Sequence, residues 1–448
     1  MPTTDARLLV LLNPGRISRH YVLGIARAAE RLRIPCITAD LTPIWAHLDR
    51  AGDSRAREQQ NVHAQFARIV RDQGITHVIG YGQTGAGDLG LIRDESGGVS
   101  TLFPALGVRH IMLWTDHPNW LLDGGSLDEP ARTLLANPRH VHVVKSIAAA
   151  DETAGVLRWP HVHSVPVGED FESITPIQNS APAHDVVAII GGAEPLPAEL
   201  APYLGQEDPD PADIDRSRIP GALKELDAVL ASHSPDPARR GACRVLADEW
   251  LAKKLARPLE SFWRLSTGLR PTHGETLEWL AASPRRWYDV TRALRIMVAW
   301  RRTFYLAWLA RRVDLGIYGA SAGALGVSQP AGADAWVPYE AQARVYSRGR
   351  LAININAAWD EEGLTHKPFQ IAASAAACVH HASRGISECF EHGREIIEFD
   401  RPAELLAAVR DLLGNDAKRR ELGSAMRSRG VRDHTWEARL PRLLSLDA

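Results

Sequence analysis

The chain has 448 residues, of which 45% are hydrophobic and 24% are charged. This length is more than one ordinary hydrophobic core organises, so we expect two domains. The formal net charge of −2 provides no overall basic field, which argues against a nucleic-acid-binding protein.

The start of the chain and its cysteines bear on where the protein works. Residues 1–5 lack the basic stretch that opens a signal peptide, and no run of about 18 apolar residues could span a membrane. The four cysteines form no Cys-x-x-Cys pair, which fits a reducing compartment and disfavours a zinc or redox centre. We therefore expect a cytoplasmic protein without a transmembrane segment, while peripheral contact with a membrane stays open.

The first part of the chain, residues 1–170, alternates between apolar strand-like runs and amphipathic helices. This alternation predicts a domain with a parallel sheet covered on both faces. Helices are expected over residues 20–32 and 61–72. Strands are expected over residues 7–12, 35–39, 77–81, 110–114, 140–144 and 161–165.

The second part of the chain repeats this α/β pattern. Residues 171–184 have the proline-rich composition of a linker, and a second domain is expected over residues 185–430. Within it, residues 215–312 predict a helical insertion. The remaining elements are strands at 185–190, 315–318, 335–337, 351–356, 377–381 and 395–399, helices at 403–413 and 416–430, and a final segment at 431–448. Open parallel sheets bind ligands at the carboxyl ends of their strands, so we seek the site there.

A polar loop over residues 362–370 leads into a helix of small residues between two of these strands. The backbone N–H groups of residues 363–365 and the positive end of the helix would suit a phosphate. Lys367 would add a mobile positive charge. From the spacing alone, an ordinary strand-to-helix connection is an equal alternative.

Residues 316–444 resemble the group-1-type glycosyltransferase domain of CgeB-like spore maturation proteins. The matching segments include Val337-Pro-Tyr339-Glu340, residues 347–356, the 362–370 loop, Gly385 to Phe390 and His434-Thr435. In the first half, Ile111 to Pro118 resembles a strand end of the same proteins, and residues 185–192 resemble the first strand of their second domain. The resemblance implies a GT-B fold, with two Rossmann-like domains that face each other across a cleft. It also implies a nucleotide-sugar donor held mainly by the second domain, no required metal and no further cofactor.

Several residues of the second domain fall at donor-binding positions of this family. They are Gly191, Gly192, Tyr318, Tyr339, Glu362, Gly363, Leu364, Thr365, Lys367, Gln370 and Glu388. Gln370 stands where related transferases carry the second Glu of a Glu-x7-Glu motif, which commonly meets the donor's ribose. Lys367 stands where CgeB-like proteins carry Arg. Glu388 is expected to open a helix, where a carboxylate can either cap N–H groups or reach the donor.

In the first domain, Asp116 and His117 follow an apolar strand. Either could act as the general base of an inverting transferase, or position the acceptor in a retaining one. A capping Asp before a proline-containing turn is the structural alternative. The turn through Gly15, Arg16, Arg19 and His20 is expected in the cleft, facing the donor, with a plain strand-to-helix turn as an equal alternative. The turn through Gly82 and Gly85 is denser in glycine than a plain turn needs, and we expect it to form a flexible wall of the acceptor site. The Gly-x-Gly-x-x-Gly string at residues 80–85 lacks an acidic strand end about 20 residues later, which argues against a nicotinamide cofactor.

The helical insertion is rich in tryptophan and, over residues 285–312, in arginine. Such a surface could bind nucleic acid, an anionic membrane or an acceptor. Packing is the preferred explanation, because helices on a sheet bury Trp rings and lay Arg stems along them. We therefore predict a metal-independent glycosyltransferase with an unidentified acceptor and no nucleic-acid partner. The alternative is a degenerate GT-B protein that binds a nucleotide or glycan, or that assists another transferase.

Overall fold

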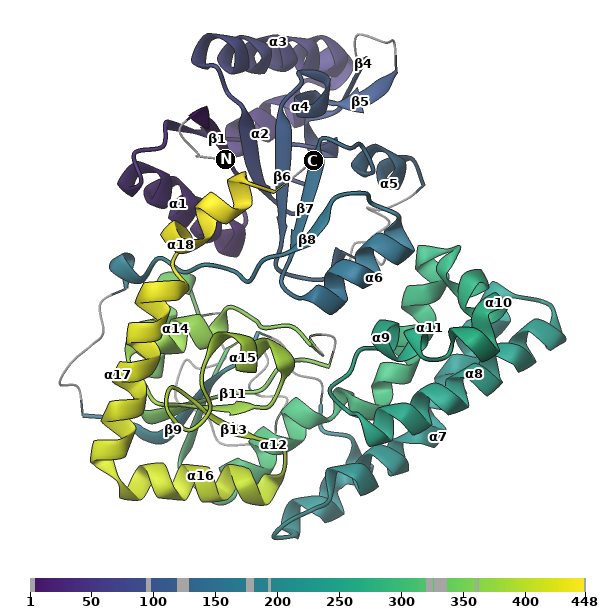
Figure 1. Cartoon of the computed structure of the whole chain (residues 1–448), viewed down its shortest axis with the longest axis vertical. Helices are drawn as coiled ribbons and strands as arrows, with labels where there is room; N and C mark the ends of the chain where they lie inside the picture. Colours follow the sequence, from purple (N-terminus) through teal and green to yellow (C-terminus); the bar gives the residue numbers. More distant parts are fainter. Residues whose placement is uncertain are drawn as a thin grey trace. The chain divides into compact units, whose positions relative to one another are not determined.

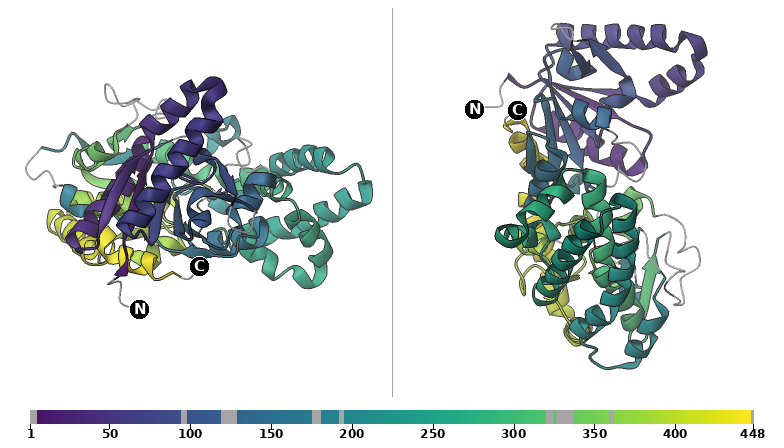
Figure 2. Two further views of the ribbon diagram at one scale, coloured as in Figure 1. Left: turned by 90° about the horizontal axis from the view of Figure 1, so that it is seen from above. Right: turned by 90° about the vertical axis from the view of Figure 1, so that its right-hand side faces the viewer.

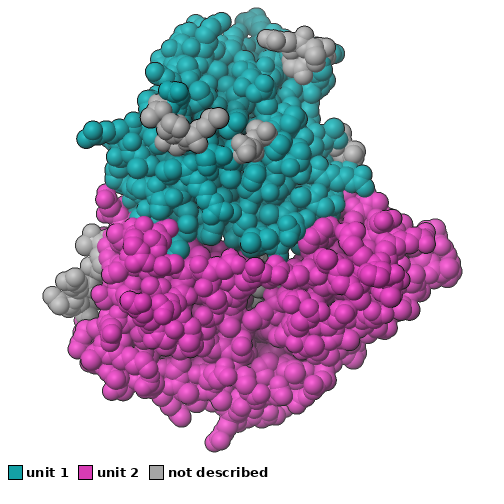
Figure 3. Space-filling view, in the orientation of Figure 1, with its two compact units in different colours: residues 1–170, 434–448 teal, residues 171–433 magenta. Residues whose placement is uncertain are grey.

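The computed structural model describes residues 5–93, 98–118, 129–174, 181–191, 195–319, 325, 337–358, 360 and 362–446. The chain forms two compact units (Figure 3), and each has its own sheet (Figure 1). Unit 1 consists of residues 1–170 and 434–448, and unit 2 consists of residues 171–433. The expected fold class, two open parallel α/β domains, is confirmed.

Unit 1 contains a six-stranded parallel sheet in the order β2-β1-β3-β6-β7-β8. The strands are β1 (Leu8–Leu12), β2 (Cys36–Asp40), β3 (His77–Tyr81), β6 (Arg109–Trp114), β7 (His140–Val144) and β8 (Val162–Ser164). Every residue of β1 and β7 is buried, as expected for strands covered on both faces. All six predicted strands are confirmed, with ends displaced by one residue at most.

Helices cover the sheet of unit 1, and their sequence signals are ordinary ones. The apolar residues of the first helix recur at helical spacing and are buried, and the third helix ends at Gly74, whose φ of +62° suits a residue without a side chain. A short antiparallel hairpin, β4 (Leu91–Arg93) and β5 (Val99–Thr101), was not predicted. The helices are α1 (Arg16–Arg31), α2 (Thr42–Arg50), α3 (Arg55–Gln73), α4 (Leu102–Ala105), α5 (Glu129–Leu135) and α6 (Ile147–Leu157).

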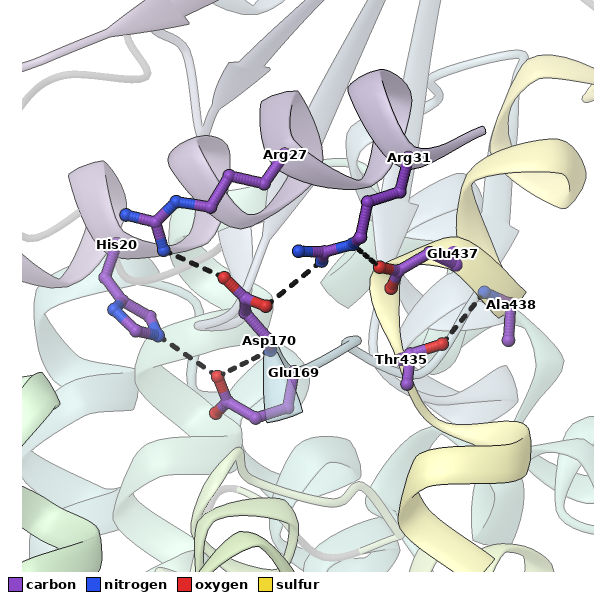
Figure 4. Close-up of polar contacts among 8 residues, drawn as sticks. All are labelled: His20, Arg27, Arg31, Glu169, Asp170, Thr435, Glu437 and Ala438. Carbon is purple, nitrogen blue, oxygen red and sulfur yellow. Dashed lines mark hydrogen bonds and ion pairs between the residues drawn. The ribbon is translucent and has the colours of Figure 1, made fainter. Parts of the chain in front are cut away.

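The last helix, α18 (Trp436–Leu444), belongs to unit 1 and packs against α1. The buried carboxylate of Asp170 accepts hydrogen bonds from Arg27 at 2.8 Å and from Arg31 at 3.0 Å (Figure 4). Arg31 also pairs with Glu437 in the first turn of α18. This network of charges ties the end of the chain to the first helix of the same unit.

Backbone contacts hold α18 in the same place. The N–H of Glu169 donates to the carbonyl oxygen of His434 at 2.9 Å. The ring of Trp436 lies so close to Gly168 that a Cβ at that glycine would be 2.7 Å from the indole. The absence of a side chain at Gly168 therefore allows the indole to pack against the chain.

Unit 2 contains a five-stranded parallel sheet in the order β10-β9-β11-β12-β13. The strands are β9 (His184–Ile189), β10 (Leu315–Tyr318), β11 (Gly349–Asn354), β12 (Cys378–His381) and β13 (Ile397–Phe399). Five of the six strands predicted here are confirmed. The sixth, at residues 335–337, lies outside the described residues except for Val337, which is not in a strand. The helices beside this sheet are α13 (Tyr339–Tyr346), α14 (Lys367–Ser374), α15 (Arg384–Cys389), α16 (Pro402–Gly414) and α17 (Asp416–Asp433).

The predicted helical insertion is confirmed, and Figure 2 shows its helices gathered beside the sheet of unit 2. Asp210 and Asp236 each cap a helix and precede a proline at its first position, a strong local start signal. The guanidinium of Arg286 lies 3.7 Å from the ring of Trp279, and Trp250 and Trp287 are buried. These contacts support the packing explanation of the Trp- and Arg-rich sequence. The helices are α7 (Pro211–His233), α8 (Pro237–Ala256), α9 (Phe262–Thr267), α10 (Arg270–Ala281), α11 (Pro284–Ala299) and α12 (Arg301–Ala310).

Candidate functional site

Each sheet has one place where the direction of winding reverses. In unit 1 the chain leaves β1 toward β2 on one side and returns to β3 on the other, and in unit 2 it does the same from β9 to β10 and β11. Open α/β sheets bind ligands at the carboxyl ends of the strands at such a place. The loops after these strands contain Gly15, Gly82, Gly85, Gly191 and the 362–370 loop, all of which were predicted as site residues.

In unit 1 the loops after β1 and β3 are bonded to each other. The Asn13 side chain donates to the hydroxyl oxygen of Thr84 at 2.9 Å and accepts from the N–H of Gly15 at 3.0 Å. Gly82 and Gly85 have φ of +56° and +85°, and a Cβ at Gly85 would collide with a neighbouring β1 side chain. The glycines thus have a structural reason for their presence, and their place on the acceptor side stays a prediction.

The basic residues at the start of α1 differ in their exposure and their partners. Arg16 is exposed, and Arg19 pairs with Asp40 at 2.8 Å. The His20 ring lies 3.1 Å from a carboxylate oxygen of Glu169 (Figure 4). Arg19 and His20 therefore already have partners inside unit 1, and their expected place in the cleft stays a prediction.

Asp116 and His117 follow β6 at the carboxyl edge of the first sheet. Asp116 is exposed, and Nε2 of His117 lies 3.6 Å from the buried carboxylate of Glu152 in α6. Burial first, and then the Asp116 charge, raise the pKa of the nearby Tyr81 phenol. An imidazole held by a buried carboxylate is the arrangement that orients a general base. Sequence reasoning missed Glu152, whose only signal is a charge in the largely apolar run of α6.

In unit 2, Glu362 has an anchoring role that the sequence did not predict. Its side chain is only 4% exposed, and one carboxylate oxygen accepts the backbone N–H of Ser261 at 2.8 Å. The other oxygen lies 3.0 Å from Nε of Arg264. Both partners belong to the start of α9, so Glu362 fastens the helical insertion to the 362–370 loop.

The backbone of this loop is held from two further sides. The Asn356 side chain donates to the carbonyl oxygen of Gly363 at 3.0 Å. A Cβ on Gly385 would be 2.8 Å from the carbonyl carbon of Gly363, so only glycine allows this approach. Leu364 is buried, and the loop is therefore positioned by packing as well as by hydrogen bonds.

The first turn of α14 contains polar groups in unusual states. Lys367 begins the helix, and burial and the neighbouring Arg302 lower the pKa of its ammonium to about 7, while Asp360 opposes the shift. Gln370 is fully buried, and no described residue hydrogen-bonds either end of its amide. The buried hydroxyl of Thr365 also has no partner among the described residues. Each such group costs about 1–3 kcal/mol in the absence of a water or ligand that hydrogen-bonds it.

A pocket opens at the carboxyl edge of the second sheet, and two of its lining residues, Arg302 and Asp360, are the charges that act on Lys367. We call it the edge pocket. Residues that follow β11 and β12, among them Asn356 and Ser383, form one wall, and α12 contributes Arg302. Asp360 also lines it. The pocket thus has both cationic and acidic side chains at the carboxyl edge of the second sheet.

Tyr318, Tyr339 and Gly191 were predicted to contact the donor. Tyr318 ends β10 with the Arg348 guanidinium 5.6 Å from its ring, and Tyr339 begins α13 with its ring 4.9 Å from that of His366. Gly191 follows β9 and is exposed, whereas Gly192 lies outside the described residues. These observations describe contacts within the protein only, so contact of Tyr318, Tyr339 and Gly191 with the donor stays a prediction.

The expectation that Glu388 opens and caps the helix after β12 is wrong. Helix α15 begins at Arg384 and is capped by Ser383, whose hydroxyl accepts the N–H of Ile386 at 3.4 Å. Glu388 lies near the other end of α15, where it is half exposed and pairs with Arg384 at 2.8 Å. The Ser383 side chain, which caps efficiently, starts the helix earlier than the acidic residue suggested.

The described residues contain no group of three or more His, Cys, Asp or Glu side chains that could hold a metal ion. No helix within these ranges is long and apolar enough to cross a membrane.

The fold and this site define an α/β protein with a candidate anion-binding edge on its second sheet. Residues 301–445 match the sequence family described as "Glycosyl transferase-like". The match runs from α12 to α18 and includes the 362–370 loop. No curated protein matches the chain.

Among solved structures, a glycosyltransferase from Rickettsia africae aligns over 98% of this chain and 97% of its own, with 8% identity and a TM-score of 0.42. Anabaena HepE in complex with UDP and glucose aligns over 98% of both chains, with 12% identity and a TM-score of 0.40. T4 phage BGT in complex with UDP-glucose aligns over 98% and 100%, with 9% identity and a TM-score of 0.44. At these values the likeness assigns no ligand to this chain.

Proposed function

We propose that this protein is a glycosyltransferase that binds a nucleotide-sugar donor on unit 2. The observation that carries the proposal is the first turn of α14, where Lys367 begins the helix and no described residue hydrogen-bonds the fully buried amide of Gln370. This turn lies within the segment that matches the glycosyltransferase-like family. We also propose that the protein is related to the CgeB-like proteins that its sequence resembles. We place it in the cytoplasm, where it could contact a membrane surface.

The donor chemistry would use charges and dipoles that this chain supplies. The N–H groups of residues 363–365, the positive end of α14 and Lys367 would face the diphosphate, and Arg302 lines the pocket beside them. Negative charge that develops on the departing diphosphate would be stabilised by these groups, so the reaction requires no metal in our proposal. An arriving phosphate would also favour the protonated form of Lys367, because an opposite charge raises the pKa of an amine.

The acceptor is proposed to bind unit 1 near Asp116 and His117. Glu152 would hold the His117 imidazole so that a ring nitrogen can take a proton from an acceptor hydroxyl. Asp116, which is exposed, is the second candidate for this role. In a retaining reaction the same groups would position the acceptor instead.

A second candidate function is nucleotide or glycan binding without transfer. Two observations favour it: an uncharged amide occupies position 370, and the Glu362 carboxylate is engaged by Ser261 and Arg264. A protein of this kind would bind a nucleotide but would neither hydrolyse nor transfer the sugar.

Calorimetric titration with UDP, GDP, ADP and dTDP tests the proposal, followed by a donor-hydrolysis assay with the matching nucleotide sugar. We expect one nucleoside diphosphate to bind and its sugar conjugate to be slowly hydrolysed. Binding without hydrolysis or transfer would favour the second candidate function. Absence of binding by all four nucleotides would contradict the proposal and would leave only glycan binding from the second candidate function.

A further inference from the structure

The edge pocket adjoins a second pocket, which we call the side pocket. The side pocket lies between the helical insertion and the ends of β12 and β13. Pro258, Leu259, Arg301 and His381 line both pockets. These four residues therefore stand where the two spaces meet.

His381, the last residue of β12, differs from the other buried histidines of unit 1 and unit 2. It is 7% exposed, its ring packs at 5.5 Å from Tyr305 and at 5.5 Å from Phe399, and no described residue hydrogen-bonds its ring nitrogens. Each of the other buried histidines that the structure describes has a partner for at least one ring nitrogen: His63, His110, His140, His142, His380 and His434. Because His381 also lines both pockets, its ring is available to a molecule bound in them.

The surroundings determine what His381 can recognise. Burial, and then the charges of Arg301 and His380, lower the pKa of His381 to about 3. The ring is therefore neutral at physiological pH and presents one N–H donor and one acceptor nitrogen. A hydroxyl group, which can both donate and accept, matches such a ring.

The charged neighbour at this junction is already engaged. Arg301 pairs with Asp215, which also accepts the indole N–H of Trp300 at 2.9 Å. Pro258 and Leu259 of the insertion add apolar surface to the same junction. A neutral hydrogen-bonding ring beside apolar surface suits a sugar, which has hydroxyls at its rim and C–H groups on its faces.

We propose that His381 hydrogen-bonds a hydroxyl of the donor's sugar, and that the junction of the edge and side pockets is the sugar subsite. This inference rests on the proposed function, because the nucleotide part would bind at the first turn of α14. It makes Pro258 and Leu259, and hence the helical insertion, part of the donor site.

The test compares nucleotide with nucleotide sugar in the full-length protein. We would measure dissociation constants by calorimetry for UDP and UDP-glucose, GDP and GDP-mannose, and ADP and ADP-glucose. His381→Phe keeps an aromatic ring but removes both nitrogens, so we expect it to weaken the sugar conjugate about tenfold and leave the free nucleotide unchanged within twofold. His381→Gln, which retains a donor and an acceptor, should recover most of the loss.

His184→Phe is the matched control, because His184 begins β9 at the opposite edge of the same sheet and bonds Asp314 at 3.1 Å. It should change neither constant. Equal weakening of nucleotide and conjugate by His381→Phe, or no weakening, would overturn the subsite while the proposed function stands. If the wild-type protein binds no nucleotide, the proposed function fails and the subsite fails with it.

A measurement on the wild-type protein covers the case in which His381→Phe does not fold, as judged by loss of its thermal transition. Conjugates that lack a single sugar hydroxyl should bind about tenfold more weakly at one position of the ring. Equal affinity of every deoxy conjugate would overturn the proposal.

Discussion

The two sheets share a winding order, yet they treat the polar groups at their carboxyl edges differently. In unit 1 Asn13 donates to Thr84 at 2.9 Å, and Nε2 of His117 lies 3.6 Å from the Glu152 carboxylate. In unit 2, Gln370 and His381 are buried, and no described residue hydrogen-bonds either side chain. The difference concerns neighbours: Asn13 and His117 of unit 1 have a polar side chain beside them, whereas no described residue hydrogen-bonds Gln370 or His381 of unit 2.

The largest expected effect is the response of unit 1 to acid. Burial first of all lowers the pKa of four histidines in or beside its central strands: to about 4 for His77 and His110, to about 3 for His142, and well below the ordinary value for His140. The unfolded chain takes up these protons near pH 6.5, so stability is complete above that pH and is lost as the pH falls toward 4. We expect unit 1 to lose several kcal/mol over this range.

Hydrogen exchange at pH 7.5 and pH 5 would measure this loss strand by strand. Unit 2 has two such histidines, His380 and His381, so its strands should open later. Earlier exchange in β11 and β12 than in β6 and β7 would contradict the comparison.

His117→Ala tests whether the paired edge of unit 1 also does chemistry. Loss of a general base should lower the transfer rate about 10²–10⁴-fold without a matching change in donor affinity. Glu152→Gln should cost less, because the imidazole remains. His47→Ala removes an exposed histidine paired with Glu58 at 3.2 Å and serves as the control. An unchanged rate in His117→Ala, once an acceptor is known, would refute the assignment.

Glu362→Ala tests the anchor between the insertion and the donor loop. Removing this carboxylate strands the N–H of Ser261 and the charge of Arg264, so we expect a loss of about 2 kcal/mol in unfolding free energy. Urea unfolding measures the loss, and a double-mutant cycle with Arg264→Ala isolates the pair. Glu388→Ala, which breaks an exposed pair in the same unit, should cost less than about 0.5 kcal/mol. Equal costs for the two variants would contradict the anchoring role.

Lys367→Ala tests the cationic turn of unit 2. We expect diphosphate binding to weaken by about 1–3 kcal/mol, the scale of a charge-assisted hydrogen bond. The pKa of Lys367 without ligand is about 7, so the side chain loses its proton as the pH rises through 7. Wild-type affinity should then fall, because Lys367 must take up a proton in order to pair with the diphosphate. Calorimetry at pH 6 and pH 8.5 measures this slope, which should be absent in the variant. A variant with wild-type affinity at both pH values would rule out the contact.

Gln370→Leu has the smallest expected effect on stability, and it should change stability and donor affinity in opposite directions. It removes two buried polar atoms that lack partners, so the ligand-free protein should gain about 1 kcal/mol in stability. Donor affinity should fall at the same time, because the amide is no longer available. Thermal unfolding with and without nucleotide measures both changes. A variant that is less stable and binds normally would show that the amide has no ligand role.

Much of the architecture could be predicted because the signals are local. Continuous apolar runs indicate buried parallel strands, and Asp-Pro and Ser-Pro starts indicate helices of the insertion. The β4–β5 hairpin was missed because its strands are three residues long and too short to show periodicity. The Glu388 cap was wrong because a carboxylate in a short helix says little about which residue starts it.

The sequence by itself determined the order of strands and helices, the glycines of the turns and the loop at residues 362–370, since each depends on neighbours along the chain. Only the tertiary structure decided that Glu362 meets Ser261 and Arg264, and that His381 lines two pockets with no hydrogen-bond partner among the described residues. Burial and pairing join residues far apart in sequence, so they depend on how the elements pack. The periodicity of a segment shows which of its faces is buried but does not show which distant residues pack against that face.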